Sequence, residues 1–498
     1  MFRLSTHSTQ VVAWIIFPVT EEFCHFVGQT MPKNDPIRKS SSAIEGRTRV
    51  MVSSLALPMC TLFFLLTYPD IIWGEALKPA AASPIIHNKP FIVVWNTPTA
   101  QCKTKFNIEL DLSVFDIVEN EHESFVGKNI TIFYKLKLGR YPFYTKELIP
   151  VNDGLVQIAS LTEHLKKAAE DINNLLDVHF HGLAVIDWEE WRPLWDRNWG
   201  FMDIYRKKSE ELVRSKFPYL PERKVVQLAI EEFENAAKKF MSETLKLGQK
   251  LRPKGFWGFY KFPECYNYFK EDAPTNYTGH CNPKDVQRNS QLSWLWKVSR
   301  ILYPSIYIKK DMKSTINTQK FVHYQIKEAL RTAALNQVSE SLPVLAYARF
   351  VYIHSLDFLT EADLIHTIGE SAAMGTCGVV LWGDMAISRT RGRCEALKDY
   401  LDQELGRYVL NTTLAATLCS KVMCSGHGRC VRQDPESQSY HHLSPRSFEI
   451  ISALTSSGSA LTARGALNLE DVQSMKEQFK CHCYKGWMGA HCQETSLI

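Results

Sequence analysis

Short apolar segments that alternate with helical patterns restrict the fold of this chain more than any other sequence feature. The segments are rich in Val, Ile and aromatic residues and lie at residues 90–96, 129–134, 182–187, 255–260, 305–308, 343–350 and 378–383. Such runs are typical of strands buried on both faces, as in a parallel sheet. Helical apolar spacing occurs between them, at residues 223–247, 318–335 and 363–374. The alternation predicts an α/β fold built as a (β/α) TIM-like barrel. An open doubly wound sheet is the alternative, but the sequence has no glycine-rich phosphate loop to support it.

The cysteines indicate a disulfide framework formed in an oxidising compartment. The chain has 13 cysteines, and those nearest the C-terminus lie at short spacings in CSKVMCSGHGRC and CHCYKGWMGAHC. These stretches resemble an EGF-like module over residues 411–498, with residues 431–480 as an inserted loop. Because the sequence has no Cys-x-x-Cys pair, and His179 and His181 lack a third ligand, we predict no metal site.

An apolar stretch far from the first residue indicates export. Residues 51–76 follow Arg47 and Arg49, have an apolar centre and end in small residues, which is typical of a signal peptide. Residues 1–50 are then an upstream extension, and an uncleaved signal anchor is the alternative. Because no hydrophobic tail follows Cys492, we predict no stable membrane anchor and a secreted protein, either extracellular or lysosomal.

Two weaker features concern the protein surface. Asn129, Asn276 and Asn411 each begin an Asn-x-Thr sequence, which predicts N-glycosylation of an exported chain. The net charge of +5 suits a polyanionic ligand only weakly, and no Lys/Arg run predicts binding to nucleic acid.

The strongest chemical signal is the stretch GLAVIDWEEWRP, where a predicted strand runs into acidic and aromatic residues. Active sites of barrels lie at the carboxyl ends of the strands. Asp187 and Glu189 are two residues apart, so their side chains should share one face, about 6–7 Å apart. Two carboxylates this close raise the pKa of one of them, which supplies a general acid. The nearby Trp188, Trp191 and Trp195 favour a sugar site, and a helix start with acidic residues in its first turn is the alternative.

Four longer motifs give the chain a wider resemblance. In order, AVIDWEEWRP, FWGFYKFPECYNY, LSWLWKVSRILYPSIY and GESAAMGTCGVVLWGD resemble motifs of the animal hyaluronidases. KPFIVVWNTPT and FVGKNITIFY are most similar to the vertebrate somatic members of that family. The resemblance covers roughly residues 85–495 and implies a distorted (β/α) barrel over residues 85–410, followed by the EGF-like module.

The resemblance also implies a reaction. Members of this family cleave β-1,4 bonds after N-acetylglucosamine in hyaluronan with retention, and the nucleophile is the substrate's own N-acetyl oxygen. By this resemblance, Glu189 protonates the leaving oxygen and later activates water, while Asp187 orients the N-acetyl group and stabilises the oxazolinium intermediate. The residues expected to bind substrate are Tyr260, Tyr307, Tyr347, Trp382, Trp188, Asn96 and Glu264. No cofactor is implied, and we expect a monomer that acts on hyaluronan and slowly on chondroitin.

Two positions depart from the family pattern. Family members often carry Asp where this chain has Glu264, a longer acid that could shift a carboxylate in the groove. Some carry Arg where this chain has Gln325, and loss of that cation would weaken the hold on a uronate.

The resemblance further implies a set of disulfides. The expected pairs are Cys102–Cys394, Cys265–Cys281, Cys419–Cys430, Cys424–Cys481 and Cys483–Cys492. Cys377 is then a buried free thiol, and Cys24 and Cys60 fall in the removed region.

Two other functions compete with hyaluronan hydrolysis. One is a hydrolase that prefers chondroitin, and the other is a catalytically silent protein that binds glycosaminoglycans. The intact pair of Asp187 and Glu189 argues against a silent protein, because a pure binder has no need of a paired acid.

Overall fold

The computed structural model describes residues 79–119, 123–269, 276–335, 337, 339–455 and 458–496. The predicted upstream extension (1–50) and signal peptide (51–76), with Cys24 and Cys60, lie outside these residues. Among the described residues, no helix is both long enough and apolar enough to cross a bilayer.

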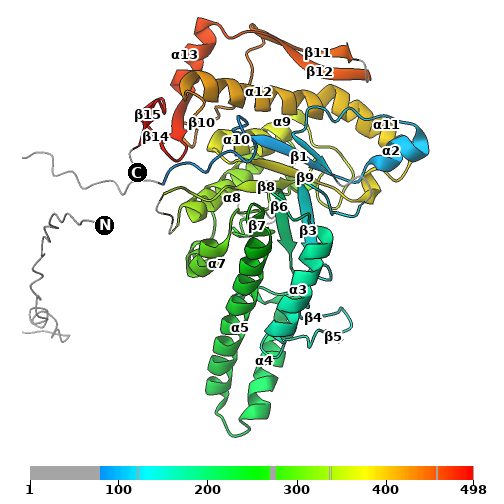
Figure 1. The fold of residues 1–498 in the computed structure, drawn as a ribbon, viewed down its shortest axis with the longest axis vertical. Coiled ribbons are helices and arrows are strands. Elements are labelled where there is room, and N and C mark those ends of the chain that lie inside the picture. The colour runs from blue at the N-terminus through cyan, green and yellow to red at the C-terminus, as the bar shows by residue number, and fades with distance from the viewer. Residues whose placement is uncertain are drawn as a thin grey trace, which may run out of the picture. The chain divides into compact units, whose positions relative to one another are not determined.

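Two parallel sheets form the centre of the fold (Figure 1). The first has the order β2-β1-β9-β8, made by β1 (Ile92–Asn96), β2 (Ile117–Glu119), β8 (Leu345–Ala348) and β9 (Gly378–Trp382). The second has the order β3-β6-β7, made by β3 (Ile130–Tyr134), β6 (Leu183–Asp187) and β7 (Phe256–Phe259). Because every pairing in both sheets is parallel, the carboxyl ends of neighbouring strands lie at the same edge.

Residues 302–305 connect the two sheets. Tyr303 pairs with Tyr260 after β7, while Leu302 and Ser305 pair with the β8 side, all in parallel single bridges. The sequence predicted a strand at residues 305–308, and this prediction is wrong for a regular strand. Pro304 has no N–H to donate to a ladder, although its carbonyl accepts from the backbone N–H of Tyr347 at 2.8 Å.

The strands bury both of their faces, as their continuous apolar sequences predict. In β1, Val93 and Trp95 pack into an outer cluster against helices, whereas Ile92 and Val94 belong to an inner cluster. The inner cluster also contains Ile130 and Ile132, Leu183 and Val185, Leu345 and Tyr347, and Val380. Successive side chains of a strand point to opposite faces, so the last residue of each strand is aimed either at the inner cluster or at the helices.

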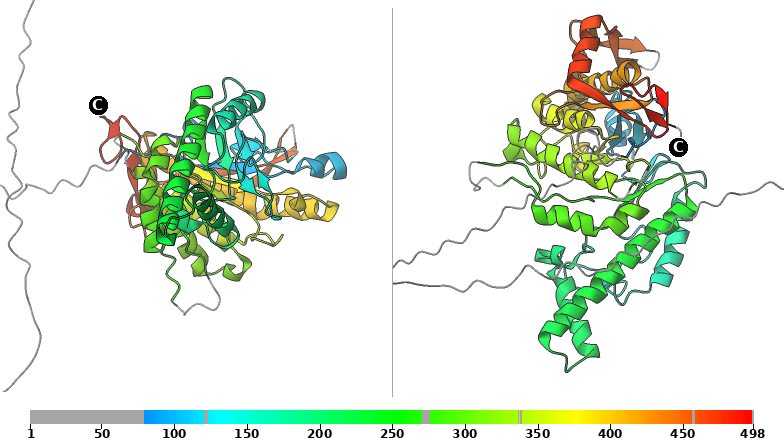
Figure 2. Two further views of the ribbon diagram at one scale, coloured as in Figure 1. Left: turned by 90° about the horizontal axis from the view of Figure 1, so that it is seen from below. Right: turned by 90° about the vertical axis from the view of Figure 1, so that its left-hand side faces the viewer.

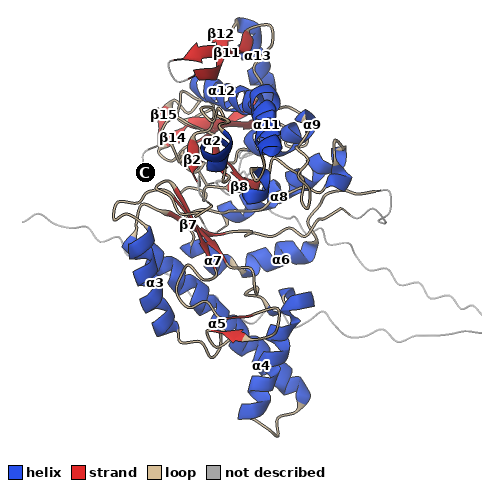
Figure 3. Ribbon diagram, turned by 90° about the vertical axis from the view of Figure 1, so that its right-hand side faces the viewer, coloured by secondary structure: helices blue, strands red, loops and turns tan. Residues whose placement is uncertain are grey.

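Helices cover the outer faces of both sheets. Figure 3 shows α11 (Arg391–Tyr400) and α12 (Gly406–Met423) on one side of the strands, with α4 (Asp203–Lys216) and α5 (Glu222–Leu251) on the other. The other α-helices that the structure describes before the C-terminal part are α2 (Ala100–Phe106), α3 (Leu161–Leu175), α6 (Pro283–Gln291), α7 (Ser293–Val298), α8 (Ile316–Ala334), α9 (Glu361–Leu364) and α10 (Glu370–Met374). The three helices predicted from apolar spacing match α5, α8 and the α9–α10 segment. The side chain of Thr360 accepts from the backbone N–H of Asp363 and so caps α9. A short antiparallel pair, β4 (Phe143–Tyr144) and β5 (Pro150–Val151), completes this part.

The C-terminal part contains more regular structure than the sequence predicted. β10 (Gly428–Arg432) pairs with β13 (Phe479–Cys483), and β14 (Trp487–Met488) pairs with β15 (Glu494–Thr495). Residues 431–480, predicted as an inserted loop, include the hairpin of β11 (Phe448–Thr455) and β12 (Gly458–Gly465) and the helix α13 (Leu469–Gln478). Figure 2 shows this hairpin and α13 beside α12. The predicted boundary at 410/411 falls inside α12, so a single helix continues from one part into the other.

All five predicted disulfides are confirmed. They join Cys102–Cys394, Cys265–Cys281, Cys419–Cys430, Cys424–Cys481 and Cys483–Cys492. The first links α2 to α11 across a sequence separation of 292 residues, which restricts the unfolded chain strongly. Cys377 is free and buried, as predicted.

The three glycosylation acceptors lie in different surroundings and stay predictions. Asn276 is exposed. Asn129 donates its side-chain amide to the carboxylate of Glu119 at 2.9 Å, and Asn411 in α12 accepts from the backbone N–H of Leu443 at 2.7 Å.

Candidate active site

Asp187 and Glu189 meet at the carboxyl end of β6. Leu183 and Val185 point into the inner cluster, and strand alternation carries Asp187 to the same side. Both acids line one pocket of about 170 Å³. The other residues lining this pocket are Ile132, Val185, Tyr260, Tyr307, Tyr347 and Trp382. The structure therefore brings the two acids together with four of the aromatic residues singled out in the sequence.

Asp187 is the more enclosed of the two acids. Its Oδ1 is buried and has no hydrogen-bond partner among the described residues. Burial, followed by the negative charge of Glu189, raises the pKa of Asp187 to about 7, while Lys261 and Arg192 act in the opposite direction. The sequence predicted that one carboxyl of the pair would have a raised pKa, and the structure shows such a shift at Asp187.

Glu189 faces the open side of the pocket, with 44% of its side chain exposed. Lys261 Nζ donates to its Oε1 at 2.9 Å, and an Arg192 guanidinium nitrogen lies 3.6 Å from the same oxygen. Arg192 also donates to the backbone carbonyl of Glu189 at 3.0 Å. The carboxylate is therefore held from two directions while keeping access to solvent.

The pocket aromatics are held by contacts of their own. Tyr260 Oη donates to Ser305 Oγ at 3.4 Å, and Trp382 Nε1 donates to Tyr134 Oη at 3.3 Å. Tyr347 Oη is buried without a hydrogen-bond partner among the described residues. A buried hydroxyl of this kind can bind a polar group of a ligand that enters the pocket.

The tryptophans that follow Asp187 do not form the expected aromatic wall. Trp188 is only 4% exposed and stacks on Tyr141 with a ring separation of 4.5 Å. Trp191 is also buried and donates to the carbonyl of Pro142, while Trp195 packs against Phe233. The prediction that Trp188 binds substrate is therefore wrong. Residues 187 and 189 point to one face, so residue 188 must point to the other, into a second outer cluster that also contains Ala184 and Ile186.

Glu264 does not line the pocket either. Its Oε1 lies 3.2 Å from Arg192 Nε, and its Oε2 lies 2.6 Å from a terminal nitrogen of Arg197. Burial raises the pKa of Glu264, but the charges of Arg192 and Arg197 outweigh this and lower it to about 2. The structure thus places Glu264 behind Glu189, where it fixes the arginine that contacts the catalytic candidate.

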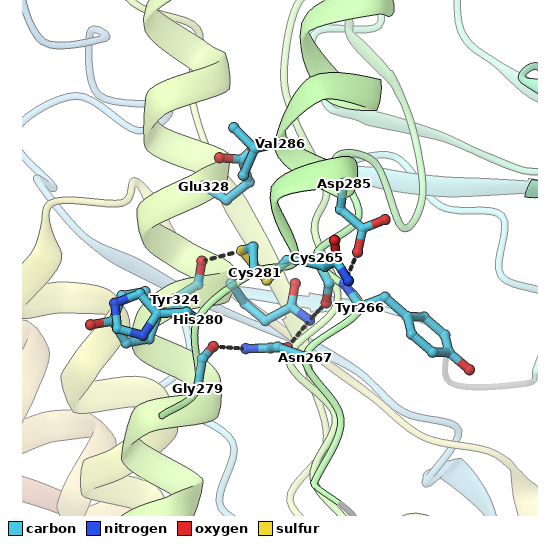
Figure 4. Close-up of a disulfide and its surroundings, with 12 residues drawn as sticks. Cys265, Tyr266, Asn267, Gly279, His280, Cys281, Asp285, Val286, Tyr324 and Glu328 are labelled. Carbon is cyan, nitrogen blue, oxygen red and sulfur yellow. Dashed lines mark hydrogen bonds between the residues drawn. A yellow bond between two sulfur atoms is a disulfide. The ribbon is translucent and has the colours of Figure 1, made fainter. Parts of the chain in front are cut away.

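Gln325 is buried away from the pocket. Its Nε2 donates to the carbonyl of Cys265 at 2.6 Å and to Asn267 Oδ1 at 3.0 Å. Figure 4 shows the Cys265–Cys281 disulfide beside Asn267, whose side-chain amide donates to the carbonyl of Gly279. Gln325 thus contributes to the packing of this loop, and the expected weaker hold on a uronate stays a prediction.

Asn96, the last residue of β1, lies on the strand face that also carries Ile92 and Val94. It is 1% exposed, and neither polar atom of its amide has a hydrogen-bond partner among the described residues. It is not among the residues that line the pocket. Its predicted contact with substrate stays a prediction.

Glu264→Gln should weaken both stability and turnover through Arg192. We expect the free energy of unfolding to fall by about 2 kcal/mol, because two enclosed guanidinium groups each lose one of their counter-charges. Urea denaturation measures this, and kcat should fall several-fold because Arg192 holds Glu189 less firmly. Glu264→Asp is the matched control and should retain most of both, since it keeps the charge. A loss in Glu264→Asp with little change in Glu264→Gln would show that side-chain length, rather than charge, is what matters.

Some functional residues were missed by the sequence analysis. Lys261 adopts a left-handed backbone conformation with φ of 71°, which directs its side chain to Glu189. The sequence gives no indication that a residue other than glycine adopts this conformation here. Among the described residues, no group of three or more His, Cys, Asp and Glu side chains could hold a metal ion.

Comparisons with known proteins identify the family of this chain. A family model described as hyaluronidase matches residues 80–496. A hyaluronidase of Crotalus adamanteus is 43% identical over 418 residues, which cover 84% of this chain and 93% of that protein. Hyaluronidase-1 of Bitis arietans is 42% identical over 431 residues, or 85% and 94% of the two chains. Among solved structures, bee venom hyaluronidase in complex with a hyaluronic acid tetramer has a TM-score of 0.57 and 32% identity, and covers 64% of this chain and 98% of that chain. From the match across the described domain and the paired acids in their pocket, the chain belongs to the hyaluronidase family of glycoside hydrolases.

Proposed function

We propose that this enzyme cuts hyaluronan internally, at the β-1,4 bonds between N-acetylglucosamine and glucuronate, with retention of configuration. The observation that carries the proposal is the unpartnered Oδ1 of Asp187, buried beside the accessible carboxyl of Glu189 in an aromatic pocket. The solved complex of bee venom hyaluronidase with a hyaluronic acid tetramer supports hyaluronan as the substrate.

In the first step, the N-acetylglucosamine ring occupies the pocket and Glu189 donates its proton to the glycosidic oxygen. The acetamido carbonyl oxygen attacks the anomeric carbon as the bond to the leaving sugar breaks, and the leaving sugar departs as an alcohol. Asp187 accepts the acetamido N–H, which satisfies the buried oxygen and orients the nucleophile. Tyr347 Oη can stabilise the same acetamido group, because it is also buried without a partner among the described residues.

In the second step, the Glu189 carboxylate takes a proton from water, and the water oxygen attacks the anomeric carbon. The oxazolinium ring opens, the acetamido group is restored, and Glu189 again carries its proton. Two attacks on opposite faces of the same carbon give net retention. Asp187 stabilises the positive charge of the oxazolinium ion between the two steps.

We also propose that the parallel sheets form the predicted distorted (β/α) barrel and that the C-terminal residues form an EGF-like module. The parallel bridges through residues 302–305, which join β7 to β8, support the barrel. The five disulfides support residence outside the reducing cytosol, in agreement with secretion.

The proposal is tested by following products from hyaluronan and from chondroitin. We expect hyaluronan oligosaccharides that end in N-acetylglucosamine, with the β-anomer formed first in proton NMR, and slower release from chondroitin. First formation of the α-anomer would contradict the substrate-assisted reaction, and faster turnover of chondroitin would reverse the substrate preference.

A further inference from the structure

Lys261 is a charged residue in contact with Glu189 to which the reaction above gives no role. It follows Tyr260 at the end of β7, and its backbone N–H donates to the carbonyl of Tyr303 at 2.8 Å. The residue has φ of 71°, a conformation that costs energy for a side chain with Cβ and is concentrated at functional sites. This backbone brings the ammonium group to within 2.9 Å of Glu189 Oε1.

Lys261 is also the most accessible of the three cations that contact pocket-lining residues in the described part of the chain. Its side chain is 31% exposed, whereas that of Arg192 is 5% exposed and already bonded to Glu264 and Glu189. Arg349 is 13% exposed, pairs with Asp384 at 3.3 Å and lies over the ring of Trp382. Of these three described cations, Lys261 alone combines exposure with direct contact to the proton-donating carboxyl.

The chemistry of hyaluronan places a second carboxylate at this point. The oxygen that Glu189 protonates is O4 of the leaving glucuronate, and the carboxylate of that sugar is carried on the neighbouring ring carbon, C5. The uronate carboxylate therefore arrives beside Glu189, where the ammonium group of Lys261 lies close enough to pair with it. An ammonium group is suited to this task because it is a compact charge on a flexible stem.

We propose that Lys261 is a specificity residue that binds the carboxylate of the uronate on the leaving-group side. The inference rests on the proposed function. As substrate binds, the ammonium group of Lys261 leaves Glu189 and pairs with the uronate carboxylate. The carboxyl of Glu189 is then free to face the glycosidic oxygen. A substrate that lacks this carboxylate leaves the Lys261–Glu189 pair in place.

The test combines a change in the enzyme with a change in the substrate. Wild type, Lys261→Met and Lys261→Arg are each assayed on hyaluronan and on carboxyl-reduced hyaluronan, in which glucose replaces glucuronate. Met keeps the Cβ and an unbranched stem, so it adds no backbone strain at φ of 71°. For the wild type, kcat/KM should favour native hyaluronan on the order of 10–100-fold, as expected for a charge-assisted contact.

The ratio of kcat/KM on the two polymers is the decisive readout, because a purely structural role of Lys261 would lower both values alike. In Lys261→Met the ratio should fall close to one, chiefly through a higher KM for native hyaluronan, and Lys261→Arg should retain most of it. An unchanged ratio in Lys261→Met, with wild type active on hyaluronan, overturns the role of Lys261 alone. A wild type inactive on both polymers overturns the proposed function, and the inference falls with it.

Discussion

Glu189→Gln should lower hyaluronan turnover on the order of 10²–10⁴-fold, because Gln can neither donate the proton to the leaving oxygen nor take one from water. The side chain keeps its size, and its contact with Lys261 can be kept through the amide oxygen. Binding of a hyaluronan oligosaccharide, measured by isothermal titration calorimetry, should therefore persist while kcat is lost.

The neighbouring Glu190 provides the matched control for this substitution. Glu190 pairs with Lys135 and is not among the residues that line the pocket. Glu190→Gln should keep kcat within a few-fold of wild type. If Glu189→Gln also kept its kcat, Glu189 could not be the proton donor, and the reaction assigned to this pocket would be wrong.

Asp187→Asn should stabilise the protein at pH 8 while abolishing most of its activity. The pKa of Asp187 is raised from 3.8 to about 7 by burial and by Glu189, so the folded protein disfavours the ionised form. A group with a raised pKa contributes stability that is present below about pH 4 and is lost as the pH rises to about 7. The difference corresponds to at most about 4 kcal/mol at pH 8.

The pH dependence distinguishes this effect from a general gain in stability. Unfolding in urea should give the variant its full advantage at pH 8 and almost none at pH 4, because both proteins are neutral at residue 187 there. Asp399→Asn, which changes an exposed carboxylate, should show no comparable trend. An equal gain at both pH values would mean that ionisation of Asp187 is not the cause.

Loss of activity in Asp187→Asn has a separate reason. The amide cannot carry the negative charge that stabilises the oxazolinium ion, so kcat should fall although the pocket keeps its shape. The negative charge of Asp187 is thus needed for catalysis, but it lowers the stability of the folded protein above neutral pH.

Local periodicity was enough to predict much of the site. The two-residue repeat of β6 placed Asp187 and Glu189 on one face. The continuous apolar runs predicted strands buried on both sides. Apolar spacing located α5, α8 and the α9–α10 segment. The disulfide pairs came from family resemblance, since spacing alone leaves many pairings open.

The sequence could not predict which side chains become partners across the fold. Applied strictly, alternation would have excluded Trp188, which lies on the opposite face from Asp187. The positions of Glu264 and Gln325 depend on Arg192, Arg197 and Asn267, which approach from other segments. The hairpin of β11 and β12 was also missed, because it lies in a stretch interpreted as a loop inserted between cysteines.

The sequence by itself determined the class of fold, the paired acids and the disulfide-rich C-terminal part, because these follow from repeats and motifs within short stretches. Only the tertiary structure decided that Asp187 is buried with a raised pKa, that Glu189 is open, and that Lys261 reaches it. The reason is physical: burial and charge at a carboxyl are set by atoms that approach from distant segments, and their positions follow from packing rather than from spacing along the chain.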